Sequence, residues 1–270
     1  MRANKSERVV EIEHLTNLGQ NVINFITNSA DMLNRTYYAI ALGSKAKVLA
    51  EMTSKTLGYI SDAPKEYLEV TEILREHCDA LVADIEEKSH WLDLPPEGLP
   101  LLHATHLIGI WGALETFVGD LFKATLKYRP EVLEGKAFEK VSLPVSVIAA
   151  GGDELYSTIY QRVLPPGSGH IGKLEDALNK VGLGGPIDEK LKKDLQSAHQ
   201  IRNVWAHNAG VVDGHFMSQC PYLGYSIGDA VELTADQYKL LTQAVVDYVT
   251  LILSRIGRRG LGGLDPEPHG

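Results

Sequence analysis

Cysteine is scarce in this sequence, and the other marks of a secreted or membrane protein are missing too. Cys78 and Cys220 are the only two cysteines among 270 residues and stand alone, so neither a disulfide framework nor a thiolate metal site is expected. The longest unbroken apolar stretches, such as residues 37–42, are far shorter than the roughly 18 residues of a membrane span. The N-terminal segment MRANKSERVVEIEH is too charged for a secretory signal. We therefore expect a cytoplasmic protein that has no membrane partner.

Positive charge is also in deficit. The chain has 26 lysines and arginines against 35 acidic residues, which gives a net charge of −9 and a pI of about 5.6. The field of such a protein does not attract nucleic-acid phosphates from all sides, so a nucleic-acid function would need a local basic site. Hydrophobic residues make up 44% of the chain, which excludes a wholly disordered protein, and the length is sufficient for a large core.

Helical periodicity is the dominant pattern that the sequence contains. Apolar residues recur at steps of three, four or seven. They predict long helices from Asp62 to about residue 88, over 102–126, over 187–208 and from Thr234 to Gly257 or Gly260, with short helices near 153–163 and 171–181. Residues 211–233 break the pattern and predict a β-hairpin or a long ordered loop. The first 60 residues are also predicted to be helical, with interruptions at Gly19 and Gly43.

This pattern predicts an all-α fold, a helical bundle with a short β-hairpin or loop insertion after the helix that ends near Asn208. We divide the chain into an N-terminal helical extension over 1–62, a helical domain over 63–257 and a flexible tail over 258–270.

The sharpest local feature is the segment IRNVWAHNAG at the end of the 187–208 helix, which contains Arg202, Asn203 and His207. Arginine carries a permanent charge that binds phosphate oxygens, and histidine exchanges protons near neutral pH. This pair of residue types suits phosphodiester cleavage, because one group stabilises developing charge while the other acts as acid or base. The alternative is structural: an arginine that binds helix-end carbonyls and a histidine that caps the last turn.

Helix geometry separates the two groups. Five residues on an ideal helix correspond to about 140° of rotation, so Arg202 and His207 do not share a face, whereas Asn203 and His207 do. The two can meet only if the helix unwinds near its end, or if a second copy brings its own pair across an interface.

The run RNVWAHN resembles the signature of HEPN domains, in which an arginine, commonly followed by asparagine, precedes a histidine by a few residues. The earlier segment LIGIWGALETFVGDLFKATL is similar to a core helix of that family, and the turn into VVDG, the segment GDAVELT and the closing helix resemble a subgroup found near bacterial defence and RNA-processing genes. The similarity covers about residues 100–256.

The resemblance implies a HEPN-like helical bundle that forms a homodimer and cleaves RNA without metal or cofactor, in defence or stress response. His207 would transfer protons, Arg202 would bind the phosphate and stabilise the transition state, and Asn203 would orient His207 or the phosphate by hydrogen bonds. Tyrosine commonly follows the motif histidine by two residues in HEPN toxins whose antitoxin is a nucleotidyltransferase. This position is Ala209 here, so control at that residue is not expected, although a regulatory protein partner is not excluded.

Three further residues are candidates for the site. The resemblance places an acidic residue near the motif arginine, so we expect Glu115 to contact Arg202; the alternative is an exposed glutamate on the side of its helix. Lys190 and Lys193, with Lys192 between them, form a modest basic patch that could guide RNA, although a solvated helix face is the commoner explanation of such a cluster. Two other functions stay open: a HEPN module without activity that binds RNA or a partner protein, and a structural helical adaptor.

Overall fold

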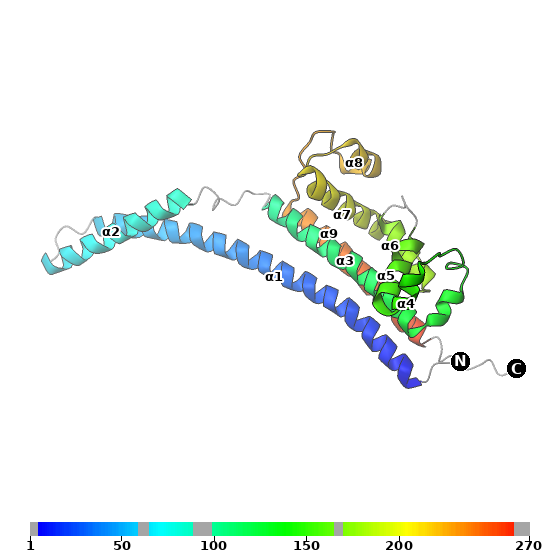
Figure 1. Ribbon diagram of the computed structural model, residues 1–270. Coiled ribbons are helices and arrows are strands. Elements are labelled where there is room, and N and C mark those ends of the chain that lie inside the picture. Colours follow the sequence, from blue (N-terminus) through cyan, green and yellow to red (C-terminus); the bar gives the residue numbers. More distant parts are fainter. Residues whose placement is uncertain (1–4, 59–64, 89–98, 165–169, 262–270) are drawn as a thin grey trace. The chain divides into compact units, whose positions relative to one another are not determined.

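The all-α prediction is confirmed by the computed structural model, which describes residues 5–58, 65–88, 99–164 and 170–261 (Figure 1). Among these residues no β-strand is present, and one isolated antiparallel bridge joins Val211 to Ala230. The segment 211–233 therefore follows the ordered-loop alternative rather than the hairpin. It contains the short helix α8 (Gly214–Gln219) and the 3-10 turn η2 (Pro221–Leu223).

The chain forms two compact units, one of residues 29–99 and one of residues 1–28 together with 100–270. Helix α1 (Lys5–Gly58) contributes to both units. The boundary predicted between 62 and 63 lies outside the described residues, as does most of the tail predicted over 258–270.

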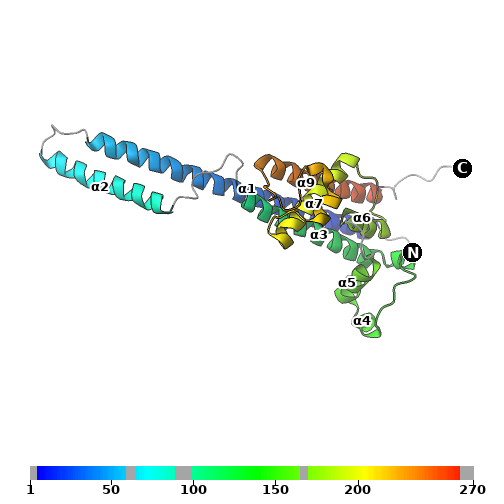
Figure 2. The same ribbon diagram turned by 90° about the horizontal axis from the view of Figure 1, so that it is seen from above.

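Three long helices form the core of the larger unit. These are α3 (Pro100–Tyr128), α7 (Glu189–Asn208) and α9 (Ala235–Leu261), which pack pairwise against one another (Figure 2). Large side chains on these helices, such as Trp111, Leu195 and Tyr248, are fully buried. Removing this apolar surface from water is the main force that holds the helices together.

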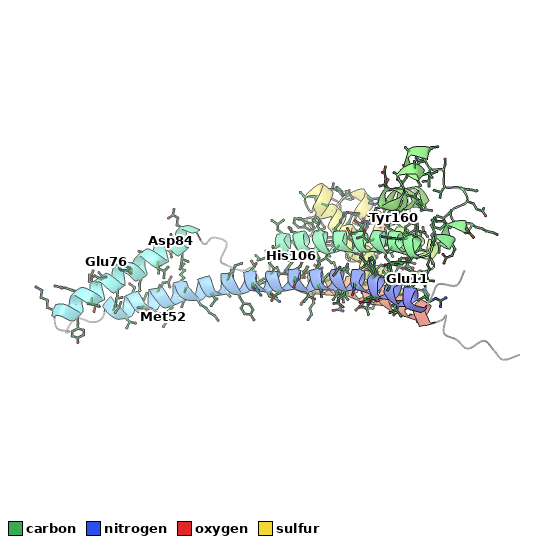
Figure 3. The ribbon with its side chains drawn as sticks, turned by 60° about the horizontal axis from the view of Figure 1, so that its bottom comes forward. Glu11, Met52, Glu76, Asp84, His106 and Tyr160 are labelled. Carbon is green, nitrogen blue, oxygen red and sulfur yellow. The ribbon has the colours of Figure 1, made fainter. Side chains whose placement is uncertain are left out.

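Shorter helices surround this core. They are η1 (Pro130–Glu134), α4 (Val145–Ala150), α5 (Gly152–Val163) and α6 (His170–Lys180). Helix α5 packs on α3, where the ring of Tyr160 meets Phe122 with centroids 5.2 Å apart (Figure 3). Burial next to the charges of Glu115 and Asp120 raises the pKa of Tyr160.

Side chains cap the starts of two core helices. Asp188 accepts hydrogen bonds from the backbone of Lys190 and Leu191 at the start of α7. At the start of α9, Thr234 and Gln237 cap each other's backbone N–H groups and so form a capping box.

Two predicted helix breaks are wrong, because helix α1 continues through Gly19 and Gly43. The end of α9, predicted at Gly257 or Gly260, lies within one residue of the later position. A glycine inside a helix costs only about 1 kcal/mol relative to alanine, which packing can offset. Gly19 illustrates this, because a Cβ there would lie 2.5 Å from Cδ2 of Leu253 on α9. The missing side chain allows the close approach of α1 and α9.

The first part of α1 belongs to the core of the larger unit. Leu15, Val22 and Ile26 are buried, and the buried Glu11 accepts a hydrogen bond of 2.6 Å from Nε of Arg129 (Figure 3). The segment predicted to be an extension therefore supplies core residues.

The smaller unit is an antiparallel pair of helices, the 29–58 part of α1 and α2 (Lys65–Lys88). Lys47 binds Glu86 with an N–O distance of 3.1 Å, and Ser54 donates a hydrogen bond to Asp79. Their packing is sparse: in the 29–58 part of α1 only Leu33 and Ala50 are buried, and none of the side chains described for α2 is buried.

Helices α3 and α9 are long and apolar enough to cross a membrane, judged by length and composition alone. Core helices of soluble proteins have the same composition, so length and hydropathy alone do not distinguish the two situations.

Candidate functional site

The motif residues occupy the last turns of α7, whose end the local sequence determines. Ala209 adopts the left-handed conformation with φ 49°, and the next residue, Gly210, also has a positive φ of 83°. The backbone N–H groups of both residues bind the carbonyl of Val204, which completes the helix end predicted at Asn208-Ala209-Gly210.

The contact predicted between Glu115 and Arg202 is present. Oε2 of Glu115 on α3 lies 3.5 Å from Nη2 of Arg202 on α7, and the two side chains are 33% and 20% exposed. Oε1 of Glu115 accepts a hydrogen bond of 2.9 Å from Nε1 of Trp111. The carboxylate therefore joins a buried tryptophan to the motif arginine.

The guanidinium group of Arg202 is only partly satisfied by these neighbours. Nη1 donates a hydrogen bond of 2.8 Å to Oδ1 of Asn203, whereas Nε is buried without a hydrogen-bond partner. Ion pairs at such half-exposed positions are weak, because solvent competes for both charges. The 3.5 Å separation is also longer than a charge-assisted hydrogen bond.

Asn203 is the centre of the cluster. Its Nδ2 donates to Nε2 of His199, 2.9 Å away, while its Oδ1 accepts from Arg202. His199 is buried, and its ring lies 5.1 Å from that of Trp111 between centroids. The amide of Asn203 is therefore held from two sides, which fits a residue that orients others.

His207 is exposed and lines a small pocket of about 140 Å³. Asn203, Asn208, Asp213 and His215 also line it. Asp213 caps α8 by accepting a hydrogen bond from the backbone of Phe216, and Asn208 donates a second one of 2.7 Å. These two bonds lower the pKa of Asp213, so it stays ionised beside the two histidines.

Arg202 and His207 do not meet within one chain. Among the described residues no hydrogen bond or ion pair joins them, and Arg202 does not line the pocket of His207. Helix α7 also does not unwind before Asn208, which removes one of the two ways in which they could meet. Asn203 is the residue that contacts Arg202 and also lines the pocket.

The lysines predicted to guide RNA lie elsewhere on α7. Lys190 is twelve residues before Arg202, about 18 Å along a helix, and its ammonium binds Asp194 at 2.9 Å. Lys193 lies over the ring of Tyr222, 4.2 Å from its centroid. The groove beside Lys190, of about 490 Å³, is also lined by Asp188, Asp194, Asp236 and Asp247, whose charge opposes phosphate.

Two neighbours of the motif, Trp111 and His199, were not among the predicted site residues. Each precedes its hydrogen-bond partner, Glu115 or Asn203, by four residues on the same helix, and side chains at that spacing are neighbours. This four-residue spacing could have identified Trp111 and His199 from the sequence.

Within the part of the chain that the structure describes, no three histidine, cysteine or acidic side chains are grouped so that they could hold a metal ion. Comparisons with models of protein families, with curated proteins and with solved structures give no match to this chain.

Proposed function

We propose that this protein is a metal-independent endoribonuclease of the HEPN type that acts as a homodimer, in defence or stress response. The observation that carries the proposal is the ion pair of Arg202 with Glu115, together with the exposed His207 at the end of the same helix. The resemblance to HEPN domains anticipates both features. Neither feature is needed to end the helix, because Ala209 and Gly210 do so through their backbone.

The proposed reaction is an internal transesterification of RNA. Neutral His207 takes the proton of the 2′-hydroxyl as its oxygen bonds to the adjacent phosphorus. The bond from phosphorus to the 5′-oxygen breaks, and a protonated histidine gives its proton to that oxygen. The products are a 2′,3′-cyclic phosphate and a 5′-hydroxyl end, with no net change in protons. Arg202 stabilises the charge on the phosphate oxygens.

A second copy of the chain can bring an arginine and a histidine together, although the two lie apart within one copy. Because Arg202 and His207 lie on different faces of α7, a cleft between two copies can place the arginine of one near the histidine of the other. It also provides two histidines, one for each proton transfer. The positive charge of Arg202 is also doubled in this cleft. An RNA-binding site requires such local positive charge, because the protein as a whole has a net charge of −9.

The experiment uses purified full-length protein and single-stranded RNA in excess chelator. We expect cleavage to 2′,3′-cyclic phosphate ends, and we expect His207→Ala and Arg202→Ala each to lower its rate by at least about a hundredfold. An RNA with one 2′-deoxy position should resist cleavage at that position. His77→Ala, at an exposed histidine of α2, serves as the matched control and should cleave like the wild type.

One observation favours a second candidate, a HEPN module that binds RNA or a partner protein without cleaving. Glu115 already neutralises Arg202 in part, which weakens its attraction for phosphate. In that case the wild type leaves varied RNAs intact, and salt-dependent RNA binding is lost in Arg202→Ala. An inert protein that also binds no RNA would contradict both candidates.

A further inference from the structure

A second histidine shares the pocket of His207. His215 is the second residue of the short helix α8, which follows the end of α7 and packs against it (Figure 1). Both histidines are exposed, and both line the same pocket of about 140 Å³. Two imidazole rings from different elements of one chain therefore border the same small volume.

Neither imidazole ring has a structural role that would explain its position. Within the described parts of the chain, no hydrogen bond or ion pair ties the ring of His207 or of His215 to another group. The backbone of Ala209 and Gly210 completes the end of α7, and the carboxylate of Asp213 caps the start of α8. Both rings are thus available to exchange protons with a bound molecule.

Asp213 holds His215 at the pocket. One oxygen of its carboxylate accepts a hydrogen bond from the backbone of Phe216 and the other accepts one of 2.7 Å from Asn208, while the backbone of His215 also donates to this carboxylate. The charge of His215 contributes to the lowered pKa of Asp213, so the two side chains interact electrostatically. A carboxylate beside a histidine stabilises the positive charge that the ring carries when it is protonated.

The pocket suits a phosphate group rather than a larger ligand. Its volume of about 140 Å³ is below the roughly 300–1,000 Å³ of sites that enclose small molecules. The amide side chains of Gln200, Asn203 and Asn208 also line it, and amide groups can donate hydrogen bonds to phosphate oxygens. A phosphodiester group in this pocket would lie next to both histidines.

The cleavage of RNA by its own 2′-hydroxyl needs two proton transfers. A base takes the proton of the 2′-hydroxyl, and an acid gives a proton to the 5′-oxygen as it leaves. A second copy of the chain would bring another His207 for the second transfer, but that ring belongs to a different chain. His215 lies in the same pocket as the base.

We infer that His215 is the general acid of the proposed ribonuclease, so that one copy supplies both proton-transfer residues and the other copy supplies the arginine. This role rests on the proposed function. Neutral His207 takes the proton of the 2′-hydroxyl while its oxygen bonds to phosphorus. The bond from phosphorus to the 5′-oxygen breaks, the electron pair stays with that oxygen, and protonated His215 gives it a proton. Exchange with solvent then restores both rings.

An RNA whose leaving 5′-oxygen is replaced by sulfur tests this role. A thiolate leaves without being protonated, because a thiol is far more acidic than an alcohol. We expect His215→Ala to slow cleavage of ordinary RNA by about a hundredfold or more, yet to cleave the 5′-thio RNA at close to the rate of the wild type. His207→Ala should slow both reactions. Equal losses of His215→Ala on the two substrates would overturn the inference.

Gln219→Ala is the matched control for His215→Ala. Gln219 is an exposed residue of the same short helix and does not line the pocket, so this variant should cleave both substrates like the wild type. Wild-type cleavage of the 5′-thio RNA by His215→Ala also shows that the variant is folded.

The pH dependence of the rate gives an independent readout. Since the base must be neutral and the acid protonated, the wild-type rate should rise and then fall as the pH increases. His215→Ala should lose the fall at high pH, and His207→Ala should lose the rise at low pH. The third titratable group that lines the pocket, Asp213, has a lowered pKa and stays ionised in this range. A fall at high pH that persists in His215→Ala would overturn the inference.

Mixed dimers show whether both histidines act from one copy. A mixture of His207→Ala with His215→Ala should stay inactive, since neither copy has both rings. A mixture of Arg202→Ala with the double variant His207→Ala/His215→Ala should regain activity, because one copy then supplies both histidines and the other the arginine. Activity in the first mixture, or none in the second, would overturn the inference.

Failure of the inference differs from failure of the proposed function. A wild type that leaves RNA intact contradicts the proposed function, and the role of His215 with it. A wild type whose cleavage requires His207 but not His215 keeps the proposed function and overturns only the assignment of the general acid.

Discussion

Ala209 adopts a backbone conformation that residues with a Cβ rarely tolerate. Its φ of 49° and ψ of 35° place it in the left-handed region, where steric contact of Cβ costs roughly 1–2 kcal/mol. Glycine is the usual residue at this position of a helix end. The strain lies two residues after His207.

We therefore expect Ala209→Gly to stabilise the protein by about 0.5–1 kcal/mol. This is less than the steric cost that is relieved, because glycine also raises the conformational entropy of the unfolded chain. Denaturant unfolding measures the change. Ala206→Gly is the matched control, since Ala206 is exposed inside the same helix, and it should destabilise by about 1 kcal/mol. Equal effects of the two substitutions would show that the backbone of Ala209 is unstrained.

At the scale of elements, a buried ion pair joins α9 to α6 and to the turn before α7. Nη1 of Arg255 lies 2.8 Å from Oε1 of Glu175, and the side chains are 8% and 13% exposed. The other nitrogen, Nη2, donates to the carbonyls of Gly185 and Pro186. The hydroxyl of Tyr248 donates to the same carboxylate at 2.6 Å, and the pKa of Tyr248 is raised by burial and by this negative charge.

Removal of Arg255 should leave the carboxylate of Glu175 without its cationic partner, although Tyr248 still donates to it, and should leave the carbonyls of Gly185 and Pro186 without this donor. We expect Arg255→Ala to destabilise the protein by about 3–5 kcal/mol, the range measured when one member of a buried pair is removed. Thermal or denaturant unfolding checks this value. Arg258→Ala removes an exposed arginine from the next turn of α9 and should change stability by less than about 0.5 kcal/mol. A small effect at both positions would mean that the buried pair contributes little.

At the scale of the whole molecule, the two units differ in how much they bury. The larger unit has fully buried aromatic and aliphatic side chains on α3, α7 and α9, whereas α2 has none among its described residues. Segments with few buried apolar contacts open more readily than a packed core.

Hydrogen exchange should reveal this difference. We expect the amides of 65–88 to exchange faster than those of 107–126. Mass spectrometry of peptides from both regions measures the two rates together. Protection of α2 that is equal to that of α3 would contradict the sparse packing.

Much of the fold follows from chemistry within a few residues. Asp188, Thr234 and Gln237 cap helices through neighbours at most four residues away, and Ala209 and Gly210 end α7 through their own backbone. The apolar stripe of α3 likewise depends only on helical spacing. Such interactions can be read from a single sequence, which is why these helices were predicted close to their observed bounds.

Other features of the fold and of the candidate site depend on interactions between distant parts of the chain. Gly19 reads locally as a helix break, yet α1 continues through it because α9 packs against it at Leu253. Glu115 lies 87 positions from Arg202, and only the packing of α3 on α7 brings their charges to 3.5 Å. Local propensities amount to about 1 kcal/mol for each residue, so burial against a distant helix outweighs them. Which partner reaches a residue is determined by the fold as a whole.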